Sequence, residues 1–161
     1  MKKLVLMLML LAPMTMMAQK FGKVNTQTIM QALPDVAKAN GELEALQKQK
    51  DNDLKAMQDE LNRKLDEYQK GQSTMNATAK QQKETELQGL NQKIQQAYQD
   101  GQQELQKKSN ELMQPIVAKV RAAIDAVGKA GNYTYIFEEG AAIYTGSNVV
   151  DVTKEVQSKI K

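Results

Sequence analysis

The sequence predicts an α+β protein in which a long antiparallel helical hairpin is attached to a small β-sheet body. Two long stretches repeat apolar residues about every 3.6 positions, which is the period of an α-helix. A polar segment, residues 71–78, separates the two stretches. Beyond the first 18 residues, strand-like sequence occurs near the two ends, in FGKVN (21–25) and YTYIFEEGAAIYTG (133–146). The helical arm would therefore begin and end at the body.

The first 18 residues, MKKLVLMLMLLAPMTMMA, have the pattern of a secretory signal peptide. Lys2 and Lys3 form a basic start, and an apolar run from Leu4 to Leu11 follows. Pro13 interrupts the apolar character before it reaches the roughly 20 residues of a membrane-spanning helix. We expect cleavage after Ala18 and secretion of the remaining chain. Because the chain contains no Cys, we expect no lipid anchor at this site.

The composition excludes much of enzyme chemistry. The chain has 161 residues, no Cys and no His, so it lacks disulfides, thiolate nucleophiles, the usual zinc ligands and the commonest general base. Its 4% aromatic content indicates a thin core and an extended shape. Loss of Lys2 and Lys3 leaves 20 basic and 19 acidic residues, a net charge of +1, which argues against a general nucleic-acid binder. We expect no catalytic residue, no cofactor and no metal.

The apolar stripes define the two helices of the arm. The first helix begins at Asp35, after a short helix that Asn25 or Thr26 caps and that Pro34 ends. Its stripe consists of Val36, Ala39, Leu43, Leu46, Leu54, Met57, Leu61, Leu65 and Tyr68, with Lys50 as one polar member. The stripe of the return helix consists of Leu87, Leu90, Ile94, Tyr98, Leu105, Leu112, Ile116, Val120, Ala123 and Val127, with Gly101 and Lys108 in the remaining places. Pro115 predicts a bend, because it removes one backbone hydrogen bond.

The body is predicted from the two ends of the exported chain. Residues 133–146 read as a β-hairpin that turns at Glu139 and Gly140, and we expect it to pair with residues 21–25. A final short helix would be capped by Asp151 or Thr153. The predicted division is residues 1–18 as signal peptide, 19–34 plus 115–161 as an oligomerisation body, and 35–114 as the arm. A body of roughly sixty residues is marginal alone, which favours association.

These features resemble the Skp/OmpH family of periplasmic chaperones. The resemblance covers essentially the whole exported chain and depends on GKVNTQTIMQALPD, the polar helical hairpin and GNYTYIFEEGAAIYTGSNVVDVTKEV. It implies a homotrimer whose three arms surround a cavity. It also implies an ATP-independent holdase function, in which unfolded outer-membrane proteins are kept from aggregating. The positions that match the trimer body are Val24, Ile136, Phe137, Ile143, Tyr144 and Val152.

The arm tip offers candidate client contacts. Residues 69–83 contain Lys70, Lys80 and Lys83 but no acid, and Met75 is predicted to be exposed in the turn. With Tyr68 these residues could contact a client. Equally, the tip could be a solvated loop, and Tyr68 could pack between the helices. The low net charge does not favour membrane-surface or lipopolysaccharide contact, which the family resemblance leaves open.

One alternative function remains open at this point. A structural coiled-coil scaffold or adaptor of the cell envelope would explain the periodicity and the export. It would not explain strand-like segments at both ends with the family's spacing. An enzyme is excluded more firmly, because the adjacent Glu138 and Glu139 would point to opposite faces of a strand rather than converge.

Overall fold

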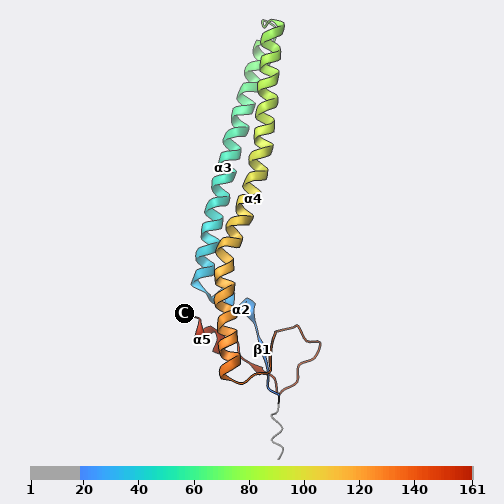
Figure 1. Ribbon diagram of the computed structural model, residues 1–161. Helices are drawn as coiled ribbons and strands as arrows, with labels where there is room; N and C mark the ends of the chain where they lie inside the picture. The colour runs from blue at the N-terminus through green and yellow to red at the C-terminus, as the bar shows by residue number, and fades with distance from the viewer. Residues whose placement is uncertain (1–18, 161) are drawn as a thin grey trace, which may run out of the picture. The chain divides into compact units, whose positions relative to one another are not determined.

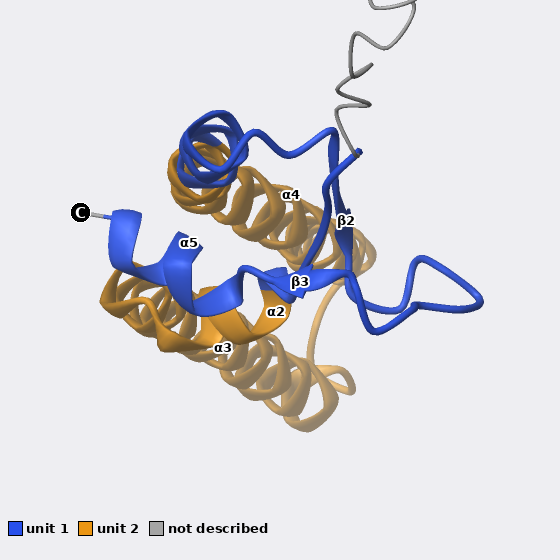
Figure 2. Ribbon diagram, turned by 90° about the horizontal axis from the view of Figure 1, so that it is seen from below, with its two compact units in different colours: residues 1–26, 122–161 blue, residues 27–121 orange. Residues whose placement is uncertain are grey.

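The computed structural model describes residues 19–160, so the expected signal peptide lies outside the described residues. Its elements are β1 (Phe21–Val24), α2 (Thr26–Ala32), α3 (Pro34–Gly71), α4 (Ala77–Ala130), β2 (Tyr135–Glu138), β3 (Val150–Asp151) and α5 (Thr153–Lys159). The chain divides into two compact units, Gln27–Arg121 and the segments on either side of it (Figure 2). The predicted mostly helical α+β class is confirmed.

The helical hairpin is formed by α3 and α4, which run side by side from a turn at one end (Figure 1). With 38 residues, α3 extends over about 57 Å at 1.5 Å per residue. Asn76 caps the second helix, since its Oδ1 accepts a hydrogen bond of 2.8 Å from the backbone N–H of Ala79. Ala39, Leu61 and Tyr68 are buried on α3, as the apolar stripe predicts.

The members of the two stripes that are not apolar contact the opposite helix of the arm. A Cβ on Gly101 would lie 3.7 Å from Cγ of Lys50, so the lysine stem covers the glycine. The Lys50 ammonium then reaches Glu104 on α4 at 2.6 Å. Lys108 likewise pairs with Glu42 at 3.3 Å. Pro115 lies inside α4, and the bend expected there stays a prediction.

The boundaries of the short elements also follow the sequence. Thr26 begins α2, and Pro34 is the first residue of α3. The backbone N–H of Thr26 donates to Oε1 of Glu138 at 3.0 Å. At the other end, Oδ1 of Asp151 accepts from the backbone N–H of Thr153 at 2.9 Å. Hydrogen bonds from the hydroxyl of Thr153 and then from its backbone N–H lower the pKa of Asp151, because both favour the charged carboxylate.

The small sheet has the strand order β2-β1-β3, and both pairs are parallel. Phe21 lies opposite Tyr135 and Val24 opposite Glu138, so the expected pairing of residues 21–25 with the 133–146 segment is confirmed for the first half of that segment. The backbone N–H of Val152 donates to the carbonyl of Lys23 at 2.9 Å and attaches the end of β3 to β1. Val152 and Val156 are then fully buried.

The expected β-hairpin is wrong. The chain does turn at Gly140, whose φ is +84°, but residues 141–149 form no returning strand. Ile143 and Tyr144, expected on that strand, are exposed. We attribute the difference to the two residues that follow the turn, because Ala141 and Ala142 gain little from cross-strand pairs. The next apolar residues pair instead with the free edge of β1, which buries Val152.

Candidate functional site

The sheet carries an exposed aromatic face. Phe21 on β1 stacks on Tyr135 and Phe137 of β2, with ring centroids 6.3 and 6.4 Å apart. The rings of Tyr135 and Phe137 lie 5.7 Å apart. Tyr135 is 59% exposed and Phe137 45%. Contiguous aromatic surface of this kind commonly marks an interaction site.

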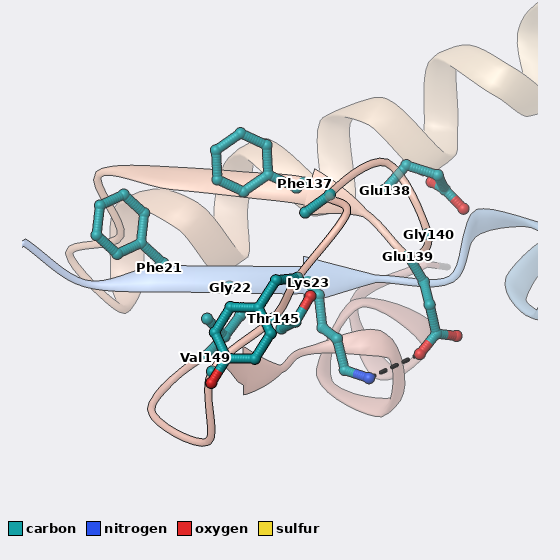
Figure 3. A pocket seen from close by; sticks show the side chains of 12 residues that line it. Phe21, Gly22, Lys23, Phe137, Glu138, Glu139, Gly140, Thr145 and Val149 are labelled. Carbon is teal, nitrogen blue, oxygen red and sulfur yellow. Dashed lines mark hydrogen bonds and ion pairs between the residues drawn. The ribbon is translucent and has the colours of Figure 1, made fainter.

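A cavity of about 250 Å³ adjoins this face, between the sheet and the loop of residues 139–149 (Figure 3). Phe21 and Phe137 supply apolar wall, and Tyr144 and Val149 come from the loop. Lys23 contributes a charge. The cavity thus joins the aromatic face to Tyr144, an exposed side chain of the loop.

One charged cluster holds the start of this loop. Nζ of Lys23 lies 2.7 Å from Oε1 of Glu139 (Figure 3), and Nδ2 of Asn25 donates to Oε2 of Glu139 at 2.8 Å. The hydrogen bond from Lys23 lowers the pKa of Glu139, and the same bond raises the pKa of Lys23. The carboxylate therefore attaches the end of β2 to the central strand. Glu138 and Glu139 have separate hydrogen-bond partners and form no acid/base pair.

The expected body residues fall into different environments. Val24 and Val152 are buried within the chain, and Ile136 is half-buried with its Cδ1 near Gly128. Phe137, Ile143 and Tyr144 are exposed. Only these last three are accessible to another molecule as large apolar side chains. The expectation that all six contribute to oligomer formation stays a prediction.

The arm tip differs from a free basic patch. Tyr68 is buried, and its hydroxyl donates to Oε1 of Glu84 at 2.6 Å, which raises the pKa of the phenol. Met75 was expected to be exposed but is half-buried, because its methyl group folds over Gly71, a position without a side chain. Tyr68 therefore packs between the helices.

The tip lysines are mostly paired with acids. Lys70 bonds to Asp66 at 2.6 Å and Lys83 to Glu86 at 3.1 Å. Lys80 is half-buried in the first turn of α4. Asp66 and Glu86 lie just outside residues 69–83, the segment that contains the three lysines and no acid. A client role for Tyr68, Lys70, Met75, Lys80 and Lys83 stays a prediction.

Ion pairs join the two arm helices at four levels. From the base to the tip they are Asp35–Lys119, Glu42–Lys108, Lys50–Glu104 and Lys64–Glu86. Between the last two levels lies an open groove of about 500 Å³. Its lining is Leu54, Gln58, Ile94, Gln95, Tyr98 and Gln99. This mid-arm groove carries no charged side chain.

The described residues offer no metal site and no membrane span. Within residues 19–160 no three His, Cys, Asp or Glu side chains gather to hold a metal ion. None of the helices in that range combines the length and the apolar character that a membrane span needs.

Residues 20–160 match the family described as "Outer membrane protein (OmpH-like)". The chain belongs to this OmpH-like family. It is 26% identical to "Chaperone protein Skp" of Pectobacterium atrosepticum over 144 residues, covering 89% of this chain and 87% of the relative. It is 25% identical to "Chaperone protein Skp" of Yersinia enterocolitica over 154 residues, covering 96% and 93%.

A solved OmpH-like structure from Caulobacter crescentus has the same fold. The TM-score is 0.77 at 14% identity, with 88% of this chain and 83% of the other covered. The OmpH/Skp family consists of chaperones for outer-membrane proteins and is non-enzymatic. The expected family and the expected lack of catalysis are thereby confirmed.

Some residues of the OmpH-like fold were not found from the sequence. Lys20 lies over the ring of Tyr133 at 4.0 Å, and its Nζ donates to the carbonyl of Gly131 at 3.1 Å. The sequence shows the alternation of Tyr133, Tyr135 and Phe137. It does not show that Phe21 stacks on this row, because that contact requires the parallel register of β1 and β2. The mid-arm groove has no motif, since it arises where two separate helices meet.

Proposed function

We propose that this OmpH-like protein is an ATP-independent holdase that keeps unfolded outer-membrane proteins from aggregating in the periplasm. The observation that carries the proposal is the similarity to chaperones over nearly the full chain, arms included. A scaffold needs one folded partner surface, whereas the arm has shallow uncharged and mixed surfaces along its length. Such surfaces favour many weak contacts over one specific contact.

The working form is a homotrimer assembled through the body. The aromatic face of Phe21, Tyr135 and Phe137, together with the exposed Ile143 and Tyr144, supports this assembly. Burial of one such side chain between subunits stabilises the assembly by about 1.5–3 kcal/mol. The less exposed body residues contribute indirectly, because they hold together the segments that carry the aromatic face. These residues are Val24, Ile136 and Val152.

The physical need for such a carrier follows from the clients. Strands of an unfolded barrel alternate apolar and polar residues and expose unpaired edges, so they aggregate in water. Several arms around one cavity retain a client by effective concentration, although each contact is weak. Release requires no nucleotide, because a client that enters the membrane loses the surface that was bound.

Charge contributes little to this binding. Lys70 and Lys83 are neutralised by neighbouring acids, so the tip lacks the dense positive charge that attracts an anionic surface. We therefore include neither lipopolysaccharide nor nucleic acid among the partners. Tyr68 acts in arm packing, while Met75 and Lys80 at the turn are the remaining tip candidates.

Export can be tested on the secreted protein. Cleavage after Ala18 leaves Gln19 as the first residue. N-terminal sequencing of protein recovered from the periplasmic fraction of an expressing cell should begin there. A protein that retains residues 1–18 would contradict this part of the proposal.

The holdase function is tested with several unrelated clients. Urea-denatured outer-membrane β-barrel proteins are diluted into buffer with the exported protein, without nucleotide, and light scattering is followed. We expect suppression for every barrel at comparable concentrations. Activity on a single protein, or on none, would favour a scaffold or adaptor instead.

A further inference from the structure

The mid-arm groove lies where the ion pairs between the helices are interrupted. Lys50–Glu104 limits it toward the base of the arm and Lys64–Glu86 toward the tip. Between these two ion pairs, the groove is lined by Leu54 of α3 and by Ile94 and Tyr98 of α4. The seam is thus apolar and open at this level, and it is bordered by charge at both ends.

The side chains in the groove are unusually accessible. Tyr98 is 57% exposed, although the apolar stripe includes it. Leu54 and Ile94 are half-buried, whereas Leu61 nearer the tip is buried. The apolar floor therefore remains available to another molecule.

The polar part of the lining consists of three amides. Gln58, Gln95 and Gln99 are exposed and make no side-chain hydrogen bond within residues 19–160. A carboxamide both donates and accepts hydrogen bonds. Three such groups beside an apolar floor match a backbone with unpaired N–H and C=O groups.

We propose that the mid-arm groove binds extended segments of unfolded polypeptide in which apolar side chains alternate with uncharged polar ones. Alternate side chains of such a segment point to one side. The apolar ones contact Leu54, Ile94 and Tyr98, and the backbone bonds to the glutamine amides. A charged side chain is disfavoured, because it would lose hydration without gaining a partner. This inference rests on the proposed holdase function and gives it a place on the arm.

The volume is consistent with this occupant. About 500 Å³ lies within the roughly 300–1,000 Å³ of sites that hold small ligands, so the groove has room for a few side chains rather than a folded domain. Its open form allows a segment to enter from the side and leave again. Each groove therefore contributes one weak contact among many.

Site-specific photocrosslinking tests the location. p-Benzoylphenylalanine replaces Tyr98 in the full exported protein, a substitution that keeps an aromatic ring in the groove. The matched control has the same group at Gln96, which is exposed on α4 but about 160° away around the helix. Each protein is mixed with a urea-diluted outer-membrane β-barrel protein and irradiated.

We expect the Tyr98 position to give about fivefold more crosslink to the barrel protein than the Gln96 position, as one desolvated aromatic contact implies. Equal yields would overturn the groove while leaving the holdase function intact if aggregation is still suppressed. A crosslink mainly to a second copy of this chain would also overturn it. If neither position crosslinks and aggregation is not suppressed, the holdase function itself is wrong.

A charge substitution tests the chemistry. Gln58→Glu places a carboxylate in the groove, and Asn52→Asp places one at an exposed position about 120° away around α3. Both replacements keep the side-chain length. We expect Gln58→Glu to lower the crosslink from position 98 several-fold and Asn52→Asp to leave it unchanged, with equal helix content by circular dichroism. Equal effects would mean that general charge, not the groove, controls contact.

Discussion

Single residues decide how closely the two arm helices approach. Gly101 is an unfavourable residue within a helix, costing about 1 kcal/mol relative to alanine. Its place opposite Lys50 explains why no large side chain stands there, because the lysine stem fills the space that a side chain longer than that of alanine would need. The ion pair with Glu104 then keeps the ammonium at the surface.

We predict opposite effects of small and large substitutions at Gly101. Gly101→Ala should stabilise the arm by up to about 1 kcal/mol, since its Cβ meets Lys50 at ordinary contact distance. Gly101→Leu should destabilise it by displacing the lysine. Urea denaturation followed by circular dichroism measures both.

Gly89 provides the control for these substitutions. A Cβ there meets nothing within 4 Å, so Gly89→Ala and Gly89→Leu should both stabilise the helix. If Gly101→Leu stabilised the protein as much as Gly89→Leu, the close approach at Lys50 would be wrong.

We predict that the bond between Lys23 and Glu139 makes the body acid-sensitive. The folded pKa of Glu139 lies below its ordinary value of 4.5, so its stabilising contribution is present above about that pH. The contribution is lost as the pH falls through the folded pKa. The melting temperature of Glu139→Gln should therefore be lower than that of the wild type at neutral pH, and the two should converge in acid. Parallel curves at all pH values would contradict this role.

At the scale of elements, the helices could be predicted and the sheet only in part. A stripe such as Val36 to Tyr68 repeats over many turns, so local periodicity determines the helix. Parallel pairing of β1 with both neighbours depends on contacts more than a hundred residues apart in sequence. The two-residue strand β3 was hidden, because Val149 and Val150 follow a long loop. The mid-arm groove was equally hidden, since no pattern on one helix reveals the other.

We predict that Val152, the residue directly after β3, stabilises the body more than Val150 within β3 does. Val152→Ala should lower the free energy of unfolding by about 2 kcal/mol, because its side chain is fully buried. Val150→Ala is the neighbouring control at a side chain that is 42% exposed, and its effect should be smaller. Thermal or urea unfolding compares the two. Equal losses would contradict the register of β3 on β1.

At the scale of the whole molecule, some apolar side chains of the body stabilise the fold of one chain, whereas the exposed ones are available for assembly. Ile136 is half-buried in its own chain, so a charge there would disturb the fold first. Tyr144 is 84% exposed and contributes little to the fold of one chain. It is therefore the cleaner position at which to test assembly.

We predict that Tyr144→Asp weakens the trimer while the helix content remains. The charge would be buried without a partner in the assembled body, which is costly. Sedimentation velocity should show smaller species than the wild type, with similar circular dichroism. An unchanged sedimentation coefficient would remove Tyr144 from the interface.

In the proposed function, several copies of this chain together hold one unfolded outer-membrane protein. Native mass spectrometry of the exported protein mixed with a urea-diluted barrel protein counts the copies in that complex. We predict a complex of three copies with one client, formed without nucleotide. A complex containing one copy, or no complex under conditions where the barrel protein stays unfolded, would contradict it.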